Sequence, residues 1–168
     1  MGRKKKSLEE LRAALVKAVR ACSAEDVAHA ADEIISSGFN LDFKVPLAVS
    51  TALGIAAFKL DARSCRILLD KGADPEYEAP LNGVVAAWMS AGYGARANPH
   101  MRGEAVETLA EFIRAGITEN EFLPLLEGNP GIVADASEFM ASMDLERNLE
   151  IFFQAAPKNR KKKSNKIF

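Results

Sequence analysis

A chain of 168 residues, 48% of them hydrophobic, is long enough to form one sizeable core, and this composition excludes an intrinsically disordered protein. Its two cysteines, Cys22 and Cys65, exclude a disulfide framework and lack metal-ligand spacing. No run approaches the roughly 18 apolar residues of a membrane span, and charged residues interrupt the N-terminus where a secretory signal would be apolar. We therefore expect a soluble protein of a reducing, intracellular compartment, namely the cytoplasm.

The formal net charge of -1 conceals a strong asymmetry along the chain. Ten of the 22 basic residues lie in residues 1–6 and 158–166, so the body between Ser7 and Pro157 holds 12 basic and 23 acidic residues, a formal charge of -11. Both basic ends read as disordered, residues 1–6 as an arm and residues 157–168 as a tail.

Helix-start and helix-end residues predict four helices in the first part of the body. Ser7 with Glu10 forms a capping-box pattern, which predicts a helix from Leu8 to about Cys22. Ser23 with Asp26 predicts a second helix over 24–37, which Gly38 ends. Residues 41–49 read as an extended connection. Two further helices follow, an inner one over 48–59 and an outer one over 62–71, which Gly72 ends.

The helix endings at Gly38, Gly72 and Gly116 recur with the same apolar neighbours. Counting back from each glycine, the same two positions hold Ile34-Ile35, Leu68-Leu69 and Phe112-Ile113. The first interval is 34 residues and the second is 44. A period near 33 that contains two helices and an extended connection is typical of ankyrin repeats.

The segment from Thr51 to Asp74 resembles an ankyrin repeat. Thr51-Ala52-Leu53-Gly54 stands where the family has Thr-Pro-Leu-His, and Ala56-Ala57, Ile67-Leu68-Leu69 and Gly72-Ala73-Asp74 match the family pattern. The proline and the histidine of the tetrapeptide are absent. The resemblance implies an all-α, ankyrin-like α-solenoid with units over about 7–40, 41–74 and 75–118 and a cap over 119–156. It also implies the usual roles of the family, as adaptor, inhibitor or effector.

The third unit departs from the pattern. We expect a short connection over 75–80, an inner helix over 81–90, and then an insertion over 91–103 that its glycines and Pro99 make a long loop. Such a loop is either functional or a neutral insertion. After Gly116 we expect a helix over 119–127 and two capping helices over 132–142 and 144–156. The last of these has an apolar face that we expect to be buried, formed by Leu145, Leu149, Phe152 and Phe153.

The sequence indicates binding rather than catalysis. Its two histidines, His29 and His100, do not belong to a catalytic triad or a metal set, and no phosphate-binding loop follows a strand. We expect no enzyme activity, no cofactor and no metal. The finger Asp74-Pro75-Glu76-Tyr77-Glu78 places an aromatic residue between acids. Tyrosine is a frequent anchor residue in protein interfaces.

The leading hypothesis is a protein-protein interaction module that binds a partner, a basic one given the acidic body, through its concave face and fingers. Its candidate partner-binding residues are Phe58, Asp74, Glu76, Tyr77, Glu78, Trp88, Tyr93, Arg96, His100 and Arg102. Phe58 and Trp88 have a competing interpretation as core residues. The alternative function is association with nucleic acid through the tails, by Arg3, Lys4, Lys5, Lys6, Arg160, Lys161, Lys162 and Lys163. The tails also fit nuclear import or simple solubilisation.

Overall fold

All regular structure in the described part of the chain is helical. A computed structural model describes the backbone of residues 6–155 and the side chains of residues 6–147. Within these residues the chain forms α-helices and two 3-10 helices, and a single isolated antiparallel bridge joins Ala79 to Val84. The prediction of an all-α protein is therefore confirmed.

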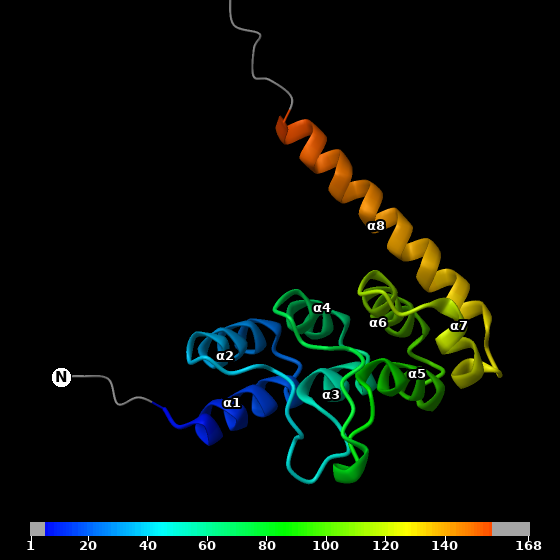
Figure 1. Cartoon of the computed structure of the whole chain (residues 1–168). Coiled ribbons are helices and arrows are strands. Elements are labelled where there is room, and N and C mark those ends of the chain that lie inside the picture. Colours follow the sequence, from blue (N-terminus) through cyan, green and yellow to red (C-terminus); the bar gives the residue numbers. More distant parts are fainter. Residues whose placement is uncertain (1–5, 156–168) are drawn as a thin grey trace, which may run out of the picture.

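The first six helices lie in two rows (Figure 1). The inner row holds α1 (Leu8–Arg20), α3 (Ala52–Phe58) and α5 (Ala87–Ala97), and the outer row holds α2 (Ala24–Ser36), α4 (Ala62–Asp70) and α6 (Arg102–Arg114). Each helix packs against the next helix of its own row and against its neighbour in the other row. Two long connections, residues 41–50 and 75–86, extend away from the inner row. We call them the first finger and the second finger.

A side chain caps the predicted helix start at Ser7, whereas the Ser23 hydroxyl at the start of α2 makes no capping bond and donates to the Asp26 carboxylate instead (2.8 Å). The Ser7 hydroxyl accepts a hydrogen bond from Glu10 N–H (3.2 Å), and the Glu10 carboxylate accepts one from Ser7 N–H (2.7 Å). The predicted capping box is therefore confirmed. Thr51 caps α3 in the same way, since its hydroxyl accepts from Gly54 N–H at 3.2 Å.

The three outer helices end in the same turn. Gly38, Gly72 and Gly116 have φ values of 85°, 91° and 107°, the left-handed region that L side chains rarely adopt. In each turn the residue after the glycine donates its N–H to a carbonyl five positions back: Phe39 to Ile34, Ala73 to Leu68, and Ile117 to Phe112. This is the hydrogen-bond pattern of a glycine-ended helix. The prediction that glycine ends these helices is confirmed.

The apolar faces of both rows meet in one core. Leu15, Ile34, Leu68 and Phe112 are among its fully buried members. Cys65 lies in this core as well, and burial, together with the charges of Asp61 and Glu111, raises the pKa of its thiol well above the ordinary value. The thiol of Cys65 thus serves as a small apolar side chain.

The prediction of a long loop over residues 91–103 is wrong. Helix α5 continues to Ala97, and only residues 98–101 separate it from α6. The glycines that suggested a loop are instead contact points. A Cβ added at Gly92 would lie 2.7 Å from Leu125, and one at Gly94 would lie 2.4 Å from the backbone oxygen of Phe58. Glycine is required there because neighbouring chain segments approach closely, which a single-sequence reading cannot distinguish from a flexible loop.

The second finger is longer than the sequence suggested. The inner helix was expected over 81–90, but α5 begins at Ala87, and residues 80–82 form a 3-10 turn. The helix expected over 119–127 is α only in α7 (Glu119–Phe122). It then continues as the 3-10 helix η2 (Leu123–Leu126), because Pro124 cannot donate to an α-helical hydrogen bond.

The two capping helices are in fact one helix, α8 (Gly131–Ala155), because no proline or glycine interrupts this segment. Its first turns pack against α6, α7 and η2, and its C-terminal turns extend past α6 (Figure 1). Leu145 is 61% exposed, so the expectation of its burial is wrong. Leu149, Phe152 and Phe153 lie outside the described side chains. No helix within residues 6–155 has the length and apolar character needed to cross a membrane.

Ion pairs link neighbouring helices of the outer row. Lys71 pairs with Asp32 of α2, and Arg114 of α6 pairs with Asp70 of α4 at 2.9 Å. The buried carboxylate of Glu111 accepts from Arg114 (2.9 Å) and pairs with Arg66 (3.2 Å). Burial by itself lowers the pKa of Arg114, but its hydrogen bonds to Asp70 and Glu111 outweigh this effect and raise it.

Candidate protein-binding surface

Backbone hydrogen bonds hold the two fingers side by side. Val85 N–H donates to the carbonyl of Val49 (3.0 Å), and the Lys44 ammonium donates to the carbonyl of Asn82 (2.5 Å). Within the second finger, Ala79 and Val84 exchange hydrogen bonds of 3.4 and 3.0 Å. These contacts fix the relative positions of the fingers, so side chains at their ends form one surface.

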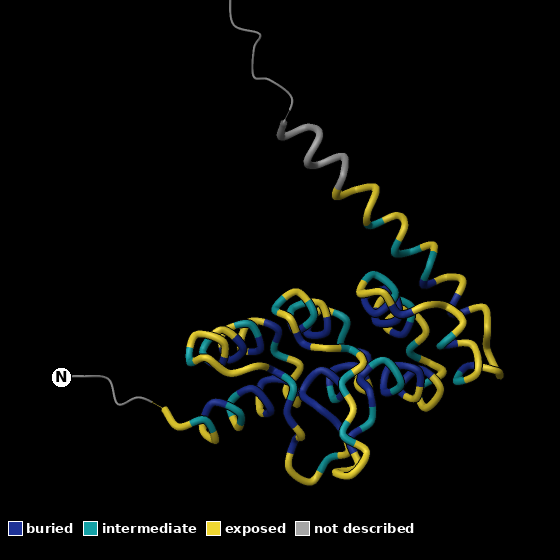
Figure 2. Tube along the Cα trace, viewed as in Figure 1, coloured by how far each residue is buried: buried dark blue, intermediate teal, exposed yellow. Residues whose placement is uncertain are grey.

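Three large apolar side chains point into solvent on these fingers. Leu47 and Leu81 are fully exposed, and Val49 is 64% exposed. We call Leu47, Val49 and Leu81 the fingertip patch; the exposed ends of both fingers are visible in Figure 2. Leu47 also has a φ of 61°, a conformation that is strained by about 1 kcal/mol or more in a residue with a side chain. Since its side chain is fully exposed, burial does not offset this strain within the described structure.

Two aromatic side chains of the inner row are also exposed. Phe58 is 48% exposed and Tyr93 is 39% exposed. They occupy the same position relative to the residues that cap α3 and α5, Thr51 and Ala86. The close approach of Gly94 to the Phe58 backbone brings this part of the two helices together. Partly exposed aromatic residues on a rigid helical face are typical interface anchors.

The sequence-predicted finger residues lie together at the start of the second finger, with Asp74 directly before it, whereas Trp88 does not join them. Asp74, Glu76 and Glu78 are exposed and Tyr77 is partly buried. Asp74 shapes the turn, since its carboxylate accepts from Glu76 N–H at 2.9 Å. Trp88 is partly buried and packs edge-to-face on Phe122, with ring centroids 5.8 Å apart. Its ring therefore contributes mainly to the core.

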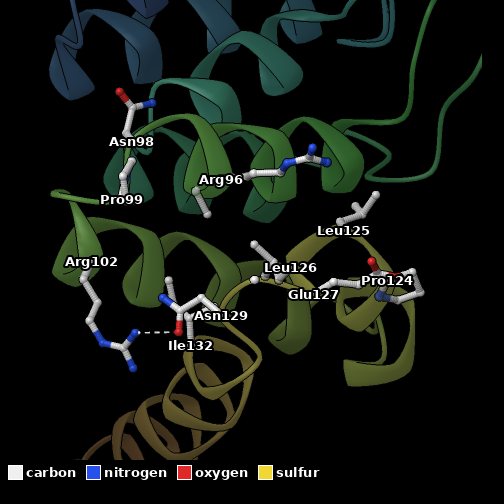
Figure 3. Close-up of a pocket in the computed structure, with 12 residues that line it drawn as sticks. Arg96, Asn98, Pro99, Arg102, Pro124, Leu125, Leu126, Glu127, Asn129 and Ile132 are labelled. Carbon is white, nitrogen blue, oxygen red and sulfur yellow. Dashed lines mark hydrogen bonds between the residues drawn. The ribbon is translucent and has the colours of Figure 1, made fainter.

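The remaining predicted residues surround the end of α5 rather than a loop. Arg96 and Arg102 line a cavity of about 410 Å³ between α5, α6 and η2 (Figure 3). Arg102 is committed to structure, since it donates to Asn129 (3.2 Å) and pairs with Asp135 at the start of α8. His100 is exposed between these helices, and Tyr93 does not line the cavity. The four residues do not converge on one site.

Among the nucleic-acid candidates, Lys6 alone lies within the described residues. Its ammonium pairs with Glu33 of α2 at 2.7 Å, so it serves to attach the start of the chain to the outer row. Arg3, Lys4 and Lys5, and also Arg160 to Lys163, lie outside the described residues. Within the described part of the chain, no group of three or more His, Cys, Asp or Glu residues could hold a metal ion.

The fingertip patch was missed by the sequence analysis, although a signal exists. Each of the two exposed leucines follows a proline, in Pro46-Leu47 and Pro80-Leu81. A repeated Pro-Leu pair in two connections of a repeat marks equivalent positions. The exposure of these leucines is visible only once the finger ends are placed in space.

Asp42 anchors the first finger to the turn after α4 and makes stability pH-dependent. Its carboxylate accepts a hydrogen bond from Asp74 N–H at 2.9 Å. Burial raises the pKa of this carboxyl, and the charge of Asp74 raises it further. The hydrogen bond lowers the pKa by less, so the net effect is a rise. The folded state therefore binds this proton more tightly than the unfolded state, and the stability of the protein falls as the pH rises through the folded pKa of Asp42.

We expect Asp42→Asn to stabilise the protein slightly at pH 7, by less than about 1 kcal/mol, because solvent screens a partly exposed carboxyl. The amide keeps the acceptor oxygen and removes the charge. The gain should disappear below a pH of about 4, where Asp42 is protonated in both states. Urea unfolding of both proteins across this range checks the prediction. A variant that is less stable at pH 7, or a gap that does not depend on pH, would contradict it.

No known protein family and no curated protein gives a match to this sequence. Function must therefore be argued from the surface itself.

Proposed function

We propose that the chain is a non-enzymatic, ankyrin-like repeat module that binds a protein partner through its fingertip patch and inner row. One observation carries the binding role: two fully exposed leucines, Leu47 and Leu81, lie at the ends of neighbouring, hydrogen-bonded fingers. Single exposed apolar residues are common on proteins, but a rigid group of them marks an interaction site. Partner binding would bury the patch and offset the strain at Leu47.

Recurring turns support the repeat. In addition to the three glycine turns, α1 and α3 are each followed by a residue with positive φ, Cys22 (52°) and Leu60 (59°). The next residue in each case, Ser23 or Asp61, occupies the N-cap position of the outer helix. The packing around Gly54 explains why this chain lacks the histidine that the family has at this position. A Cβ on Gly54 would lie 1.7 Å from the Ser50 hydroxyl, so the histidine of the family would not fit there unless Ser50 moved.

The proposal predicts that Leu47→Asn with Leu81→Asn weakens partner binding by at least about tenfold, since buried interface leucines contribute about 1 kcal/mol or more each. The fold should be retained, because neither side chain is buried and asparagine tolerates a positive φ. The measurement is affinity capture from lysate of the source cells, followed by mass spectrometry and titration of the captured protein.

Leu145→Asn is the matched control, because Leu145 is exposed but lies on α8, away from the fingers. Wild type and the Leu145 variant should retain the same protein, and the fingertip variant should lose it. The proposal would be refuted if wild type, the fingertip variant and the Leu145 variant all captured the same proteins in equal amounts.

A further inference from the structure

An open groove of about 840 Å³ runs between α1 and the first finger. Its floor is formed by the buried Val16, Phe43 and Val45, and its exposed apolar residues are Ala13, Ala21 and Pro46. Val45 and Pro46 directly precede Leu47 in the chain, so the lining of the groove ends one residue before the fingertip patch. A ligand that covers the patch from this side would also reach the groove.

The charges that line the groove oppose those of the body. Four basic residues line it against a single acidic one, Glu9. The basic residues are Arg12, Lys17, Arg20 and Lys44. None of the four forms an ion pair within the described part of the chain, whereas Lys71, Arg102 and Arg114 each pair with a carboxylate. The groove is therefore a locally positive region of a body whose formal charge is -11.

Arg12 is held in place without an acceptor. Its guanidinium lies over the ring of Phe43, 4.8 Å from the ring centroid. Its Nε atom is buried and has no hydrogen-bond partner within the described structure. A buried donor without an acceptor is costly, and a carboxylate is the acceptor that a planar guanidinium binds best. Arg12 is partly exposed and lines the groove, so the ring contact holds its charge beside any ligand there.

We propose that the groove binds an acidic peptide segment of the partner. Its carboxylates would meet the guanidinium of Arg12 and the exposed charges of Lys17 and Arg20, while an apolar side chain packs on the exposed Ala13 and Pro46. This inference rests on the proposed function, because the first finger belongs to both surfaces. It replaces the expectation of a basic partner with an acidic one at this end of the molecule.

The apolar lining and the charge decide between occupants. A nucleic-acid backbone would use the cations but would leave the exposed apolar residues of the lining, Ala13, Ala21 and Pro46, without a contact. Both termini of this chain carry the same sign as the groove, since Arg3–Lys6 and 158–166 are basic, and they would be repelled from it. An acidic segment with an apolar anchor satisfies both parts of the lining.

The test is a selection of binders to the full-length chain from a library of random displayed peptides. The selected peptides should carry an excess of Asp and Glu around a large apolar residue. Lys17→Glu with Arg20→Glu should weaken their binding at least about tenfold, since each like-charge contact opposes an acidic ligand. Both side chains are exposed and lack ion-pair partners in the described structure, so the variant should fold normally; its melting temperature checks this.

Arg63→Glu with Arg147→Glu is the matched control, because it changes the net charge equally at exposed residues outside the groove. It should alter affinity by less than about twofold at physiological salt. Neutral or basic selected peptides, an absence of binders, or equal affinity of both variants would overturn the inference. So would a fluorescent single-stranded RNA that binds through Lys17 and Arg20 more tightly than the peptides. A wild-type dimer that the Lys17, Arg20 variant dissociates would also overturn it, since a second copy would then be the occupant.

The fingertip variant separates this inference from the proposed function. If Leu47→Asn with Leu81→Asn abolishes partner capture while the groove variant does not, only the acidic-segment inference is wrong. If both variants capture the partner as wild type does, the proposed function is wrong as well.

Discussion

Glu111→Ala is expected to lower the free energy of unfolding by about 3 kcal/mol, the largest effect we predict for a charged residue. The carboxylate is buried and holds Arg114 by hydrogen bonds and Arg66 by an ion pair. Its loss removes contacts between α4 and α6 and leaves the partly buried Arg114 with Asp70 as its partner. Denaturant unfolding measured by circular dichroism checks the value.

Glu107→Ala provides the control, since Glu107 lies one turn earlier on the same helix and is exposed. It should change stability by less than about 0.5 kcal/mol. Glu111→Gln should fall between the two, because an amide keeps an acceptor but loses the charge. Equal stability of the Glu111 and Glu107 alanine variants would show that the buried carboxylate does not hold the outer row together.

Gly94→Ala is expected to destabilise the protein by about 2–3 kcal/mol, although alanine normally favours a helix over glycine. The added Cβ would lie 2.4 Å from the backbone oxygen of Phe58, and backbone cannot move aside as a flexible side chain can. α3 and α5 must therefore separate at the point where they pack most closely. Thermal and urea unfolding of the variant measure the loss.

Gly103→Ala is the matched control within α6, because a Cβ there meets nothing within 4 Å. This substitution should leave stability unchanged or raise it by up to about 1 kcal/mol. If both glycine variants were stabilised, the close contact of α3 with α5 would not exist in solution, and the prediction of a mobile loop over 91–103 would regain its basis.

Local signals in the sequence predicted much of the fold. The capping box at Ser7 and the glycine turns depend on a few neighbouring residues, and these are the elements that the structure confirms. Gly92 and Gly94 misled because their role depends on segments far away in the chain, namely Leu125 and Phe58. The division of α8 into two helices was wrong, because residues 132–155 contain no proline or glycine that would end a helix.

The candidate surface was predicted less well than the fold. The second finger was identified as a binding element, but its apolar end and the whole first finger were not. Charge counting along the chain gave an acidic body, yet the groove beside α1 gathers Arg12, Lys17, Arg20 and Lys44 from two separate segments. A local positive charge of this kind depends on which residues the fold brings together. It is not visible in a charge that is summed along the sequence.

The most direct test of the binding surface is an NMR titration of the isotope-labelled chain with its captured partner. Our account predicts that shifted or broadened backbone amide signals concentrate in residues 41–50, 75–86 and α1, and at Phe58 and Tyr93. Perturbations confined to the outer row, α2, α4 and α6, with both fingers unaffected, would contradict it.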